Sequence, residues 1–180
     1  MIFRQAGYHS GISTIIINNQ NEPEDFYPFV LDVREYYLTQ YVDYKQDDIY
    51  KKLRLIVIAG EVFIRHVLLN DSWLIYSTNS REFMCKNKIY IEKEKKILDS
   101  FNDDLKPYIK KQIKEIYQKI GLDYFGIDCF VDKNFNMLIF EVNASMNILI
   151  KPKDLPNKLI FNKKTDLIVE AIKQMIGKRL

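Results

Sequence analysis

Three oxygen-bearing side chains of one predicted hairpin could together bind a divalent cation. The segment GLDYFGIDCFVDKNFNMLIFEVNASMN has two strand-like runs on either side of the polar turn DKNFN. If that turn is centred between Asn134 and Phe135, Asp128 and Glu141 lie equally far from the centre and face each other across the strands. Side chains alternate between the two faces of a strand, so Asn143 shares the face of Glu141. The hairpin therefore brings two carboxylates and one amide together.

Two carboxylates in such a pair repel each other, because their Cβ atoms lie about 5 Å apart. A proton or a cation between them removes the repulsion. Mg²⁺ takes oxygen ligands, usually one or two carboxylates together with phosphates and water, and an asparagine oxygen can complete the set. We therefore expect a magnesium site formed by Asp128, Glu141 and Asn143.

The residues around the acids predict strands that are covered on both faces, since apolar side chains occupy both alternating sets. Buried acids need partners, which favours the metal site. The alternative is a solvated hairpin face that carries the acids by chance. Cys129 alternates away from Asp128 and is expected in the core. The apolar neighbours are Phe125, Ile127, Phe130, Ile139, Phe140 and Val142.

Strands are also predicted in the first half of the chain. MIFRQA and STIII read as two strands joined by the Gly-flanked turn GYHSG, and REYYLTQYVDY is rich in aromatic and β-branched residues. KKLRLIVIAG and EVFIRHVLL read as two further strands that meet at Ala59 and Gly60. This order predicts an antiparallel meander.

Helical spacing begins at Lys88. IYIEKEKKILDSF and LKPYIKKQIKEIYQKIG carry apolar residues three and four apart, and Gly121 stands where a helix C-cap is expected. NKKTDLIVEAIKQMIGKRL predicts a last helix after the hairpin. The helices would flank the predicted strands.

Composition sets the broad class. The chain has 180 residues, 47% of them hydrophobic and 28% charged, which is typical of a soluble globular protein. A formal charge of +3, from 27 basic and 24 acidic residues, is too small to indicate a nucleic-acid partner. Cys85 and Cys129 lack the spacing of a zinc site or a disulfide framework. With no signal peptide and no apolar run near about 18 residues, we expect a cytoplasmic protein without membrane contact.

The hairpin, with its D…EVN pattern, is similar to the metal-binding hairpin of the ATP-grasp superfamily, in which an aspartate and an E-x-N hold the magnesium of MgATP. Segments earlier in the chain also resemble segments of this superfamily, and they occur in the same order. IFRQAGYHSGISTIII resembles the strand, Gly-rich flap and strand over the nucleotide phosphates, and YYLTQYVDY resembles the hinge strand beside the adenine. KKLRLIVIAGEVFIRHVLL resembles the next strand pair, and Trp73 follows it as in some bacterial members. The resemblance spans Ile2 to Met146.

This resemblance implies an α+β ATP-grasp fold of antiparallel sheets with flanking helices and a nucleotide cleft between two lobes. Residues 1–180 would form a single domain, with 1–45 as the flap and adenine-hinge lobe and 46–180 as the metal-binding lobe. The N-terminal substrate domain and the first part of the central one would be absent, so the chain is truncated at that end relative to the family. The family's N-x-P-G sequence is replaced by residues 143–147, NASMN, which alters the acceptor loop.

The resemblance also assigns the ligands. ATP would contact Arg4, the flap residue His9 and the hinge residues Gln40, Tyr41 and Val42, while the magnesium ligands would be the three residues of the hairpin. Arg54 and either Arg65 or His66 would stabilise charge on the transferring phosphoryl group. Arg65 and His66 are adjacent, so only one of them can point into a cleft. Surface roles for the arginines and a plain turn position for His9 are the alternatives.

The expected activity is that of an ATP-dependent ligase, which joins a carboxylate to an amine through an acylphosphate. Both substrates are unknown, and a partner chain or a homodimer could supply the missing lobe. The alternative is a non-catalytic nucleotide-binding remnant or partner subunit. A third reading is a metal-dependent nuclease with a D…E-x-K hairpin. Because Asn143 stands at its lysine position, Lys133 or Lys151 would have to substitute.

Overall fold

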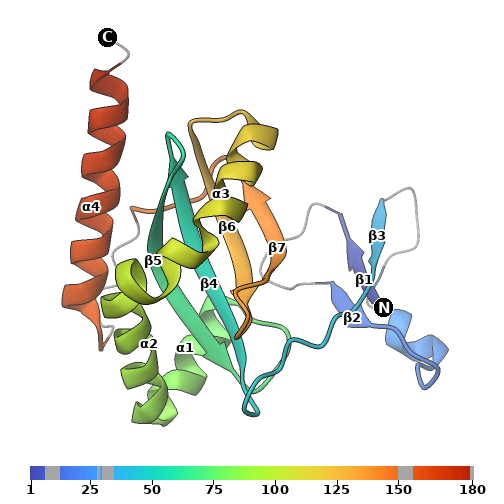
Figure 1. Ribbon diagram of the computed structural model, residues 1–180. Coiled ribbons are helices and arrows are strands. Elements are labelled where there is room, and N and C mark those ends of the chain that lie inside the picture. Colours follow the sequence, from blue (N-terminus) through green and yellow to red (C-terminus); the bar gives the residue numbers. More distant parts are fainter. Residues whose placement is uncertain (7–12, 28, 30–34, 150–155, 179–180) are drawn as a thin grey trace.

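Within the residues that the structure describes, two antiparallel sheets and four α-helices make up an α+β fold (Figure 1). The structure is a computed structural model, and it describes residues 1–6, 13–27, 29, 35–149 and 156–178. The α+β class and the antiparallel pairing are those predicted from the sequence. None of the helices in these described ranges has the length and apolar composition needed to cross a bilayer.

The smaller sheet has the strand order β2-β1-β3. Its strands are β1 (Ile2–Gln5), β2 (Thr14–Ile16) and β3 (Tyr36–Thr39), with a 3₁₀ turn at Pro23–Phe26. Phe3 is its packing centre, because its ring stacks on Tyr36 at 5.0 Å and meets Phe29 edge-on at 5.1 Å. The predicted strand pair at the N-terminus is confirmed, and the GYHSG turn lies outside the described residues.

The larger sheet has the order β5-β4-β6-β7. β4 (Tyr50–Ile58) and β5 (Glu61–Asn70) form the predicted hairpin, and Ala59 and Gly60 have the positive φ values, 49° and 84°, that its tight turn requires. β6 (Tyr124–Val131) pairs with β4, and β7 (Met137–Asn143) pairs with β6. β7 is therefore an edge strand.

Four α-helices follow or flank these strands. They are α1 (Ser77–Lys86), α2 (Lys88–Ser100), α3 (Lys106–Ile120) and α4 (Lys158–Gly177), with a π-helical turn at Phe101–Leu105 between α2 and α3. Gly121 has φ +68° and caps α3 as predicted. The sequence reasoning missed α1, because its segment STNSREFMCK has too few apolar residues to show a helical period.

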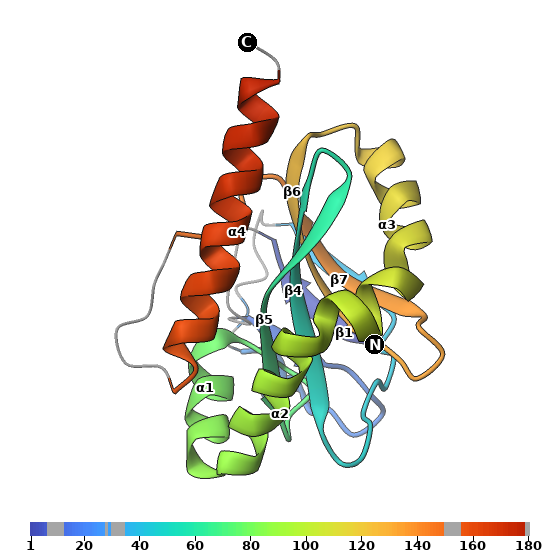
Figure 2. The same ribbon diagram turned by 60° about the vertical axis from the view of Figure 1, so that its left-hand side comes forward.

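One face of the large sheet carries the main core. Leu53, Leu55 and Val57 of β4 alternate onto it, as do Phe125, Ile127 and Cys129 of β6. The helix side chains Leu98, Phe101, Ile109 and Ile113 cover this face. Figure 2 shows α2 and α3 running along it. The expectation that Cys129 is a core residue is confirmed.

The other face of the large sheet is apolar only at its two ends. At one end, which we call the aromatic cluster, Tyr44, Tyr50, Leu68, Ile75 and Phe130 pack together. At the opposite end, Ile56, Ile58, Met146, Ile148 and Ile168 form a second cluster that includes α4. Because side chains alternate, Lys52 and Arg54 fall between the two clusters on this same face.

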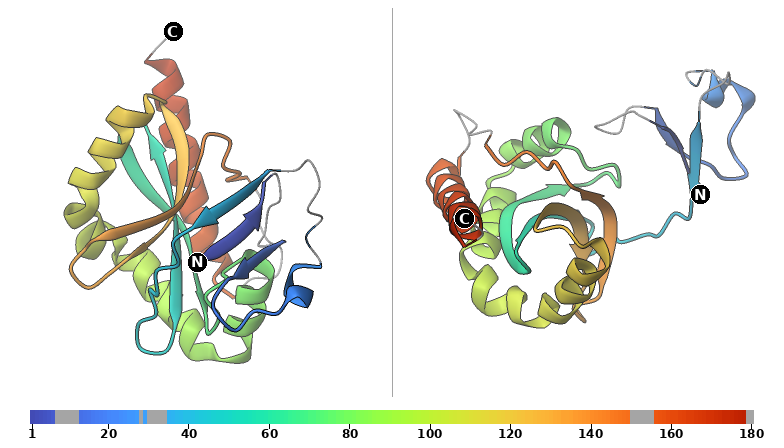
Figure 3. Two further views of the ribbon diagram at one scale, coloured as in Figure 1. Left: turned by 90° about the vertical axis from the view of Figure 1, so that its right-hand side faces the viewer. Right: turned by 90° about the horizontal axis from the view of Figure 1, so that it is seen from above.

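Figure 3 shows the helices around the large sheet and the small sheet standing to one side, joined to it by the chain after β3. The prediction that both hairpin strands are covered on both faces holds for β6 and is wrong for β7. Ile139, Phe140 and Val142 are 41%, 38% and 37% exposed. The reason is the edge position of β7, which no further strand or helix of the described chain covers completely.

Candidate functional site

Four polar side chains lie in line across the four strands of the large sheet. His66 of β5 pairs with Arg54 of β4, Arg54 pairs with Asp128 of β6, and Asp128 pairs with Glu141 of β7. Paired residues of antiparallel strands share a face, so all four belong to the face between the aromatic cluster and the α4 cluster. We call this line of residues the polar row.

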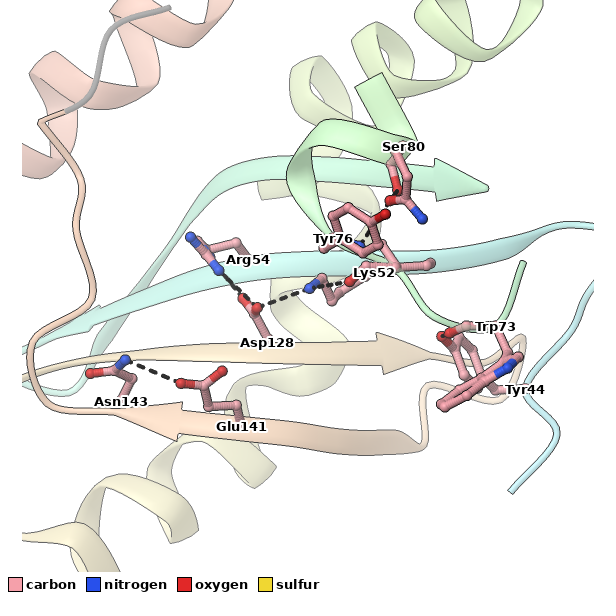
Figure 4. A network of polar contacts seen from close by, with 11 residues as sticks. Tyr44, Lys52, Arg54, Trp73, Tyr76, Ser80, Asp128, Glu141 and Asn143 are labelled. Atoms are coloured by element: carbon pink, nitrogen blue, oxygen red, sulfur yellow. Dashed lines mark hydrogen bonds and ion pairs between the residues drawn. The ribbon is translucent and has the colours of Figure 1, made fainter. Parts of the chain in front are cut away.

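Asp128 is the centre of the polar row (Figure 4). Its side chain is buried, and Arg54 donates two parallel hydrogen bonds to it, Nε to Oδ1 and Nη2 to Oδ2, both at 2.8 Å. The Nζ of Lys52 lies 3.2 Å from Oδ2 and also donates to the carbonyl oxygen of Ile75 at 2.8 Å. Two cations of β4 therefore hold one carboxylate of β6.

These contacts decide the ionisation of the group. Burial by itself would raise the pKa of Asp128, but the hydrogen bonds from Arg54 and the charges of Lys52 and Arg54 outweigh it and lower this pKa below its ordinary value. Burial lowers the pKa of Arg54, and Asp128 more than compensates, so this pKa is raised. The pair is charged throughout the physiological range.

Glu141 and Asn143 form the outer part of the row on the edge strand. Both side chains are half-buried, and Asn143 Nδ2 donates to Glu141 Oε1 at 3.1 Å. Asn143 Oδ1 accepts from the backbone N–H of Ser145 at 2.8 Å. The predicted opposition of Asp128 and Glu141 is confirmed by the strand register.

Asp128 and Glu141 form the expected pair, but the strand register between them and the turn differs from the expected one. Near the turn, Val131 pairs with Met137, so the hairpin is centred on Asn134 and not beyond it. A β-bulge then shifts the register between Asp128 and Cys129, which restores the expected pair. The extra residue is Phe140, whose ring packs against Tyr44 with centroids 4.9 Å apart.

The charge of the acid pair is compensated differently from the prediction. A proton or a metal ion was expected between the acids, whereas Arg54 and Lys52 already neutralise Asp128. Within the described residues, no three His, Cys, Asp or Glu side chains form a metal-binding group. The available donors are two carboxylates and an amide, all oxygen ligands, which is the chemistry that Mg²⁺ takes when phosphates supply the rest.

The structure distinguishes between Arg65 and His66. A register shift in β5 places Arg65 at a β-bulge, and its guanidinium lies 5.9 Å from the ring centroid of Phe161. His66 faces the same side as Arg54, and its Nε2 is buried with no hydrogen-bond partner in the described part of the chain. Burial, followed by the charges of Arg54 and Arg81, lowers the pKa of His66 well below its ordinary value. His66 is thus a neutral member of the polar row.

The predicted nucleotide ligands lie on other elements. Arg4 is on the central strand of the small sheet, paired with Thr14 and Tyr37, and His9 lies outside the described residues. Gln40, Tyr41 and Val42 follow β3 in the connection between the sheets, and Gln40 and Val42 are exposed. The structure therefore brings together Arg54, His66 and the three hairpin residues, whereas Arg4, Gln40, Tyr41 and Val42 lie apart from them on other segments.

Tyr41 joins the connection to the aromatic cluster. Its hydroxyl lies 3.3 Å from that of Tyr50, and its ring meets Trp73 edge-on at 5.8 Å. Trp73 is partly buried and packs against this cluster. Val42 lines a shallow cavity of about 300 Å³ beside the cluster, so one hinge candidate borders a hollow of the surface.

Lys52 is the site residue that the sequence reasoning missed. The run KKLRL contained a signal, because Lys52 and Arg54 are two residues apart and must share a face of the strand. Of the two lysines named for the nuclease alternative, the structure describes one. Lys133 lies 73% exposed in the hairpin turn near Asp47, and Lys151 is outside the described residues.

Comparisons with known proteins add the following. No protein-family model matches this sequence, and no curated protein matches it. Among solved structures, the Chryseobacterium gregarium RiPP-associated ATP-grasp ligase, in complex with ADP and a leader and core peptide, is similar with 16% identity and a TM-score of 0.47. The match covers 99% of this chain and 48% of that one.

Macrocyclase MdnC from Microcystis aeruginosa MRC, bound with precursor peptide MdnA, is also similar, with 16% identity and a TM-score of 0.30. This match covers 67% of the present chain and 30% of MdnC. The chain thus spans less than half the length of either protein.

Proposed function

We propose that this chain is the nucleotide- and metal-binding part of an ATP-grasp ligase that joins a carboxylate to an amine. The observation that carries the proposal is the polar row, which places opposed acids beside two strand cations on one face of a sheet, between two apolar clusters. The order of segments that resemble the family, from Ile2 to Met146, supports the same function. Residues 1–45 would be the flap and hinge lobe, and 46–180 the metal-binding lobe.

The proposed reaction has two steps. A carboxylate oxygen of the substrate attacks the γ-phosphorus of ATP, the bond to the bridging oxygen breaks, and ADP and an acylphosphate form. An amine then attacks the acyl carbon, loses a proton and expels inorganic phosphate, which leaves an amide. No side chain of the protein needs to form a covalent bond.

The residues of this chain would act by position and charge. Arg54 and Lys52 offer N–H donors to phosphate oxygens, and the guanidinium can hold two of them at once. His66, neutral and adjacent to Arg54, would approach the same group. Fixed donors at the place where charge is transferred lower the barrier of phosphoryl transfer.

Magnesium, when bound, would neutralise the triphosphate charge. Glu141, Asn143 and Asp128 would hold it, and their oxygen donors fit such an ion. ATP would meet Arg4, His9 and the hinge residues Gln40, Tyr41 and Val42 when the small sheet covers the site.

The second candidate is a non-catalytic nucleotide-binding remnant or partner subunit. The observation that favours it is that Arg54 and Lys52 engage both oxygens of Asp128. A carboxylate held in this way can serve as a structural ion pair alone. Incubation with ATP and a mixture of carboxylates and amines separates the two candidates, because only the ligase releases ADP in an amine-dependent manner.

Calorimetric titration with MgATP tests the proposal itself. The Asp128→Ala, Glu141→Ala double variant should bind MgATP at least about tenfold more weakly, since even outer-shell partners of a metal contribute that much. The control removes two exposed helix acids, Glu82 and Glu170, and should bind as the unaltered chain does. Equal affinity in the site variant would count decisively against the metal site.

A further inference from the structure

Asp128 Oδ2 has no room for a metal ion while both of its cations stay in place. It accepts one hydrogen bond from Arg54 Nη2 at 2.8 Å and lies 3.2 Å from Lys52 Nζ. A carboxylate oxygen offers about two lone-pair sites, and both are used. Oδ1 accepts from Arg54 Nε at 2.8 Å as well. A divalent ion bound to Oδ2 at about 2.1 Å must therefore displace one of these donors, whereas Oδ1 keeps a second lone pair.

Asp128 and Glu141 differ in their exposure to solvent. Asp128 is 2% exposed, whereas Glu141 is half-buried on the edge strand and bonds to Asn143 in the described part of the chain. An ion arriving alone meets an accessible Glu141 and an Asp128 that two cations already neutralise. These cations also repel the arriving ion.

Phosphate offers the two cations another partner. The side chains of Arg54 and Lys52 are 26% and 15% exposed, so they can be reached on the face between the two apolar clusters. Guanidinium and ammonium groups donate charge-assisted hydrogen bonds to phosphate oxygens, just as they do to carboxylate oxygens. Lys52 keeps a second anchor, the carbonyl of Ile75, which holds its ammonium near Asp128.

We propose that Lys52, together with Arg54, withholds Oδ2 of Asp128 from a divalent cation until a nucleotide triphosphate draws the two side chains away. The nucleotide and the metal ion then bind with positive coupling, which is equal in both directions. Lys52 is a positioning residue in this scheme. The inference rests on the proposed function and assigns to that site the order in which its ligands bind.

Mn²⁺ binding, measured by electron paramagnetic resonance, tests the scheme without an activity readout. The unaltered chain should bind Mn²⁺ weakly alone and more tightly with a non-hydrolysable ATP analogue. Lys52→Met should bind Mn²⁺ alone at least about fivefold more tightly, and the gain from the analogue should shrink correspondingly. Lys51→Met is the matched control. It makes the same charge change one residue away, where Nζ lies 5.5 Å from the ring centroid of Phe130.

The outcomes are distinct. If Lys52→Met binds Mn²⁺ no more tightly than the unaltered chain, the inference is wrong while the proposed function stands. If the analogue binds but Mn²⁺ binds to no variant under any condition, both the inference and the proposed metal site fail. Circular dichroism checks folding. Lys52→Gln, which can still donate to the Ile75 carbonyl without a charge, serves if Lys52→Met does not fold.

Discussion

The position of Asp128 could be predicted from the sequence, but its contacts could not. Its place opposite Glu141 and its burial follow from alternation within one hairpin. Its bonds to Arg54 and Lys52 do not, because they depend on the pairing of β6 with β4, and Arg54 is 74 positions away in the chain. The sequence therefore predicted the acids of the site and offered Arg54 only through resemblance.

Stability should depend on pH through Asp128. Its pKa is lowered in the folded protein, so its contribution is complete above about pH 4, the ordinary range of a carboxyl, and is lost as the pH falls through the lower folded value. Asp128→Asn should cost roughly 3 kcal/mol at pH 7, because it leaves two largely buried cations unpaired.

Urea unfolding of both proteins between pH 7 and pH 3 measures this dependence. The difference in the free energy of unfolding should narrow below about pH 4, as the unaltered chain loses its ion pairs. A difference that stays constant would show that the pairs do not contribute. Asp71→Asn, at an exposed loop position, is the control.

At the scale of elements, the sequence predicted long or strongly patterned segments and missed a polar one. The sequences of the β4–β5 hairpin, α2, α3 and α4 have a clear hydrophobic period. The sequence of α1 has none, and this helix depends on tertiary contacts. Asn70 Nδ2 donates to Ser80 Oγ at 3.2 Å, and Met84 is fully buried against the sheet. Tertiary packing replaces the missing local pattern there.

Gly126 of β6 is a second element-level feature, because a Cβ there would lie 2.5 Å from Met146 Cβ and 2.4 Å from Met146 Cγ. Gly126→Ala should therefore lower the free energy of unfolding by about 1–3 kcal/mol. It should also disturb the loop after Asn143, which pairs with Gly126.

Thermal unfolding gives the stability change, and MgATP titration gives the effect on the site. Gly177→Ala at the end of α4 is the matched control, since a Cβ there would meet nothing within 4 Å. An unchanged melting temperature in Gly126→Ala would show that Met146 moves aside without cost.

At the scale of the whole molecule, the two sheets of the described chain share little packing. The described strands of the small sheet contact mainly one another. The segment that connects β3 to β4 packs against the large sheet through Tyr44. Tyr44 donates to the carbonyl of Trp73 at 2.6 Å and its ring packs against Tyr50 and Phe130. The strand order predicted one meander, and only the resemblance implied two lobes. The prediction is wrong for β3, which pairs with β1 in the small sheet, because the packing of the connection after β3 has no periodic signal.

Hydrogen exchange should reveal this division. Backbone amides of β1 should exchange at least roughly a hundredfold faster than those of β4, because a small sheet with few outside contacts opens without global unfolding. Mass spectrometry of peptides covering 1–6 and 53–58 measures both rates, with β6 as an internal reference. Equal protection of β1 and β4 would mean that the two sheets unfold as one unit.

The bulge at Phe140 has a consequence for how relatives of this site can be found. The interval between Asp128 and Glu141 is the sum of a turn and one inserted residue. A regular hairpin with a longer turn would present the same two acids at the same spacing, and a hairpin without the insertion would present them at another. A fixed interval is therefore a poor fingerprint, whereas a lysine and an arginine two apart on the adjoining strand make a search criterion that tolerates either hairpin.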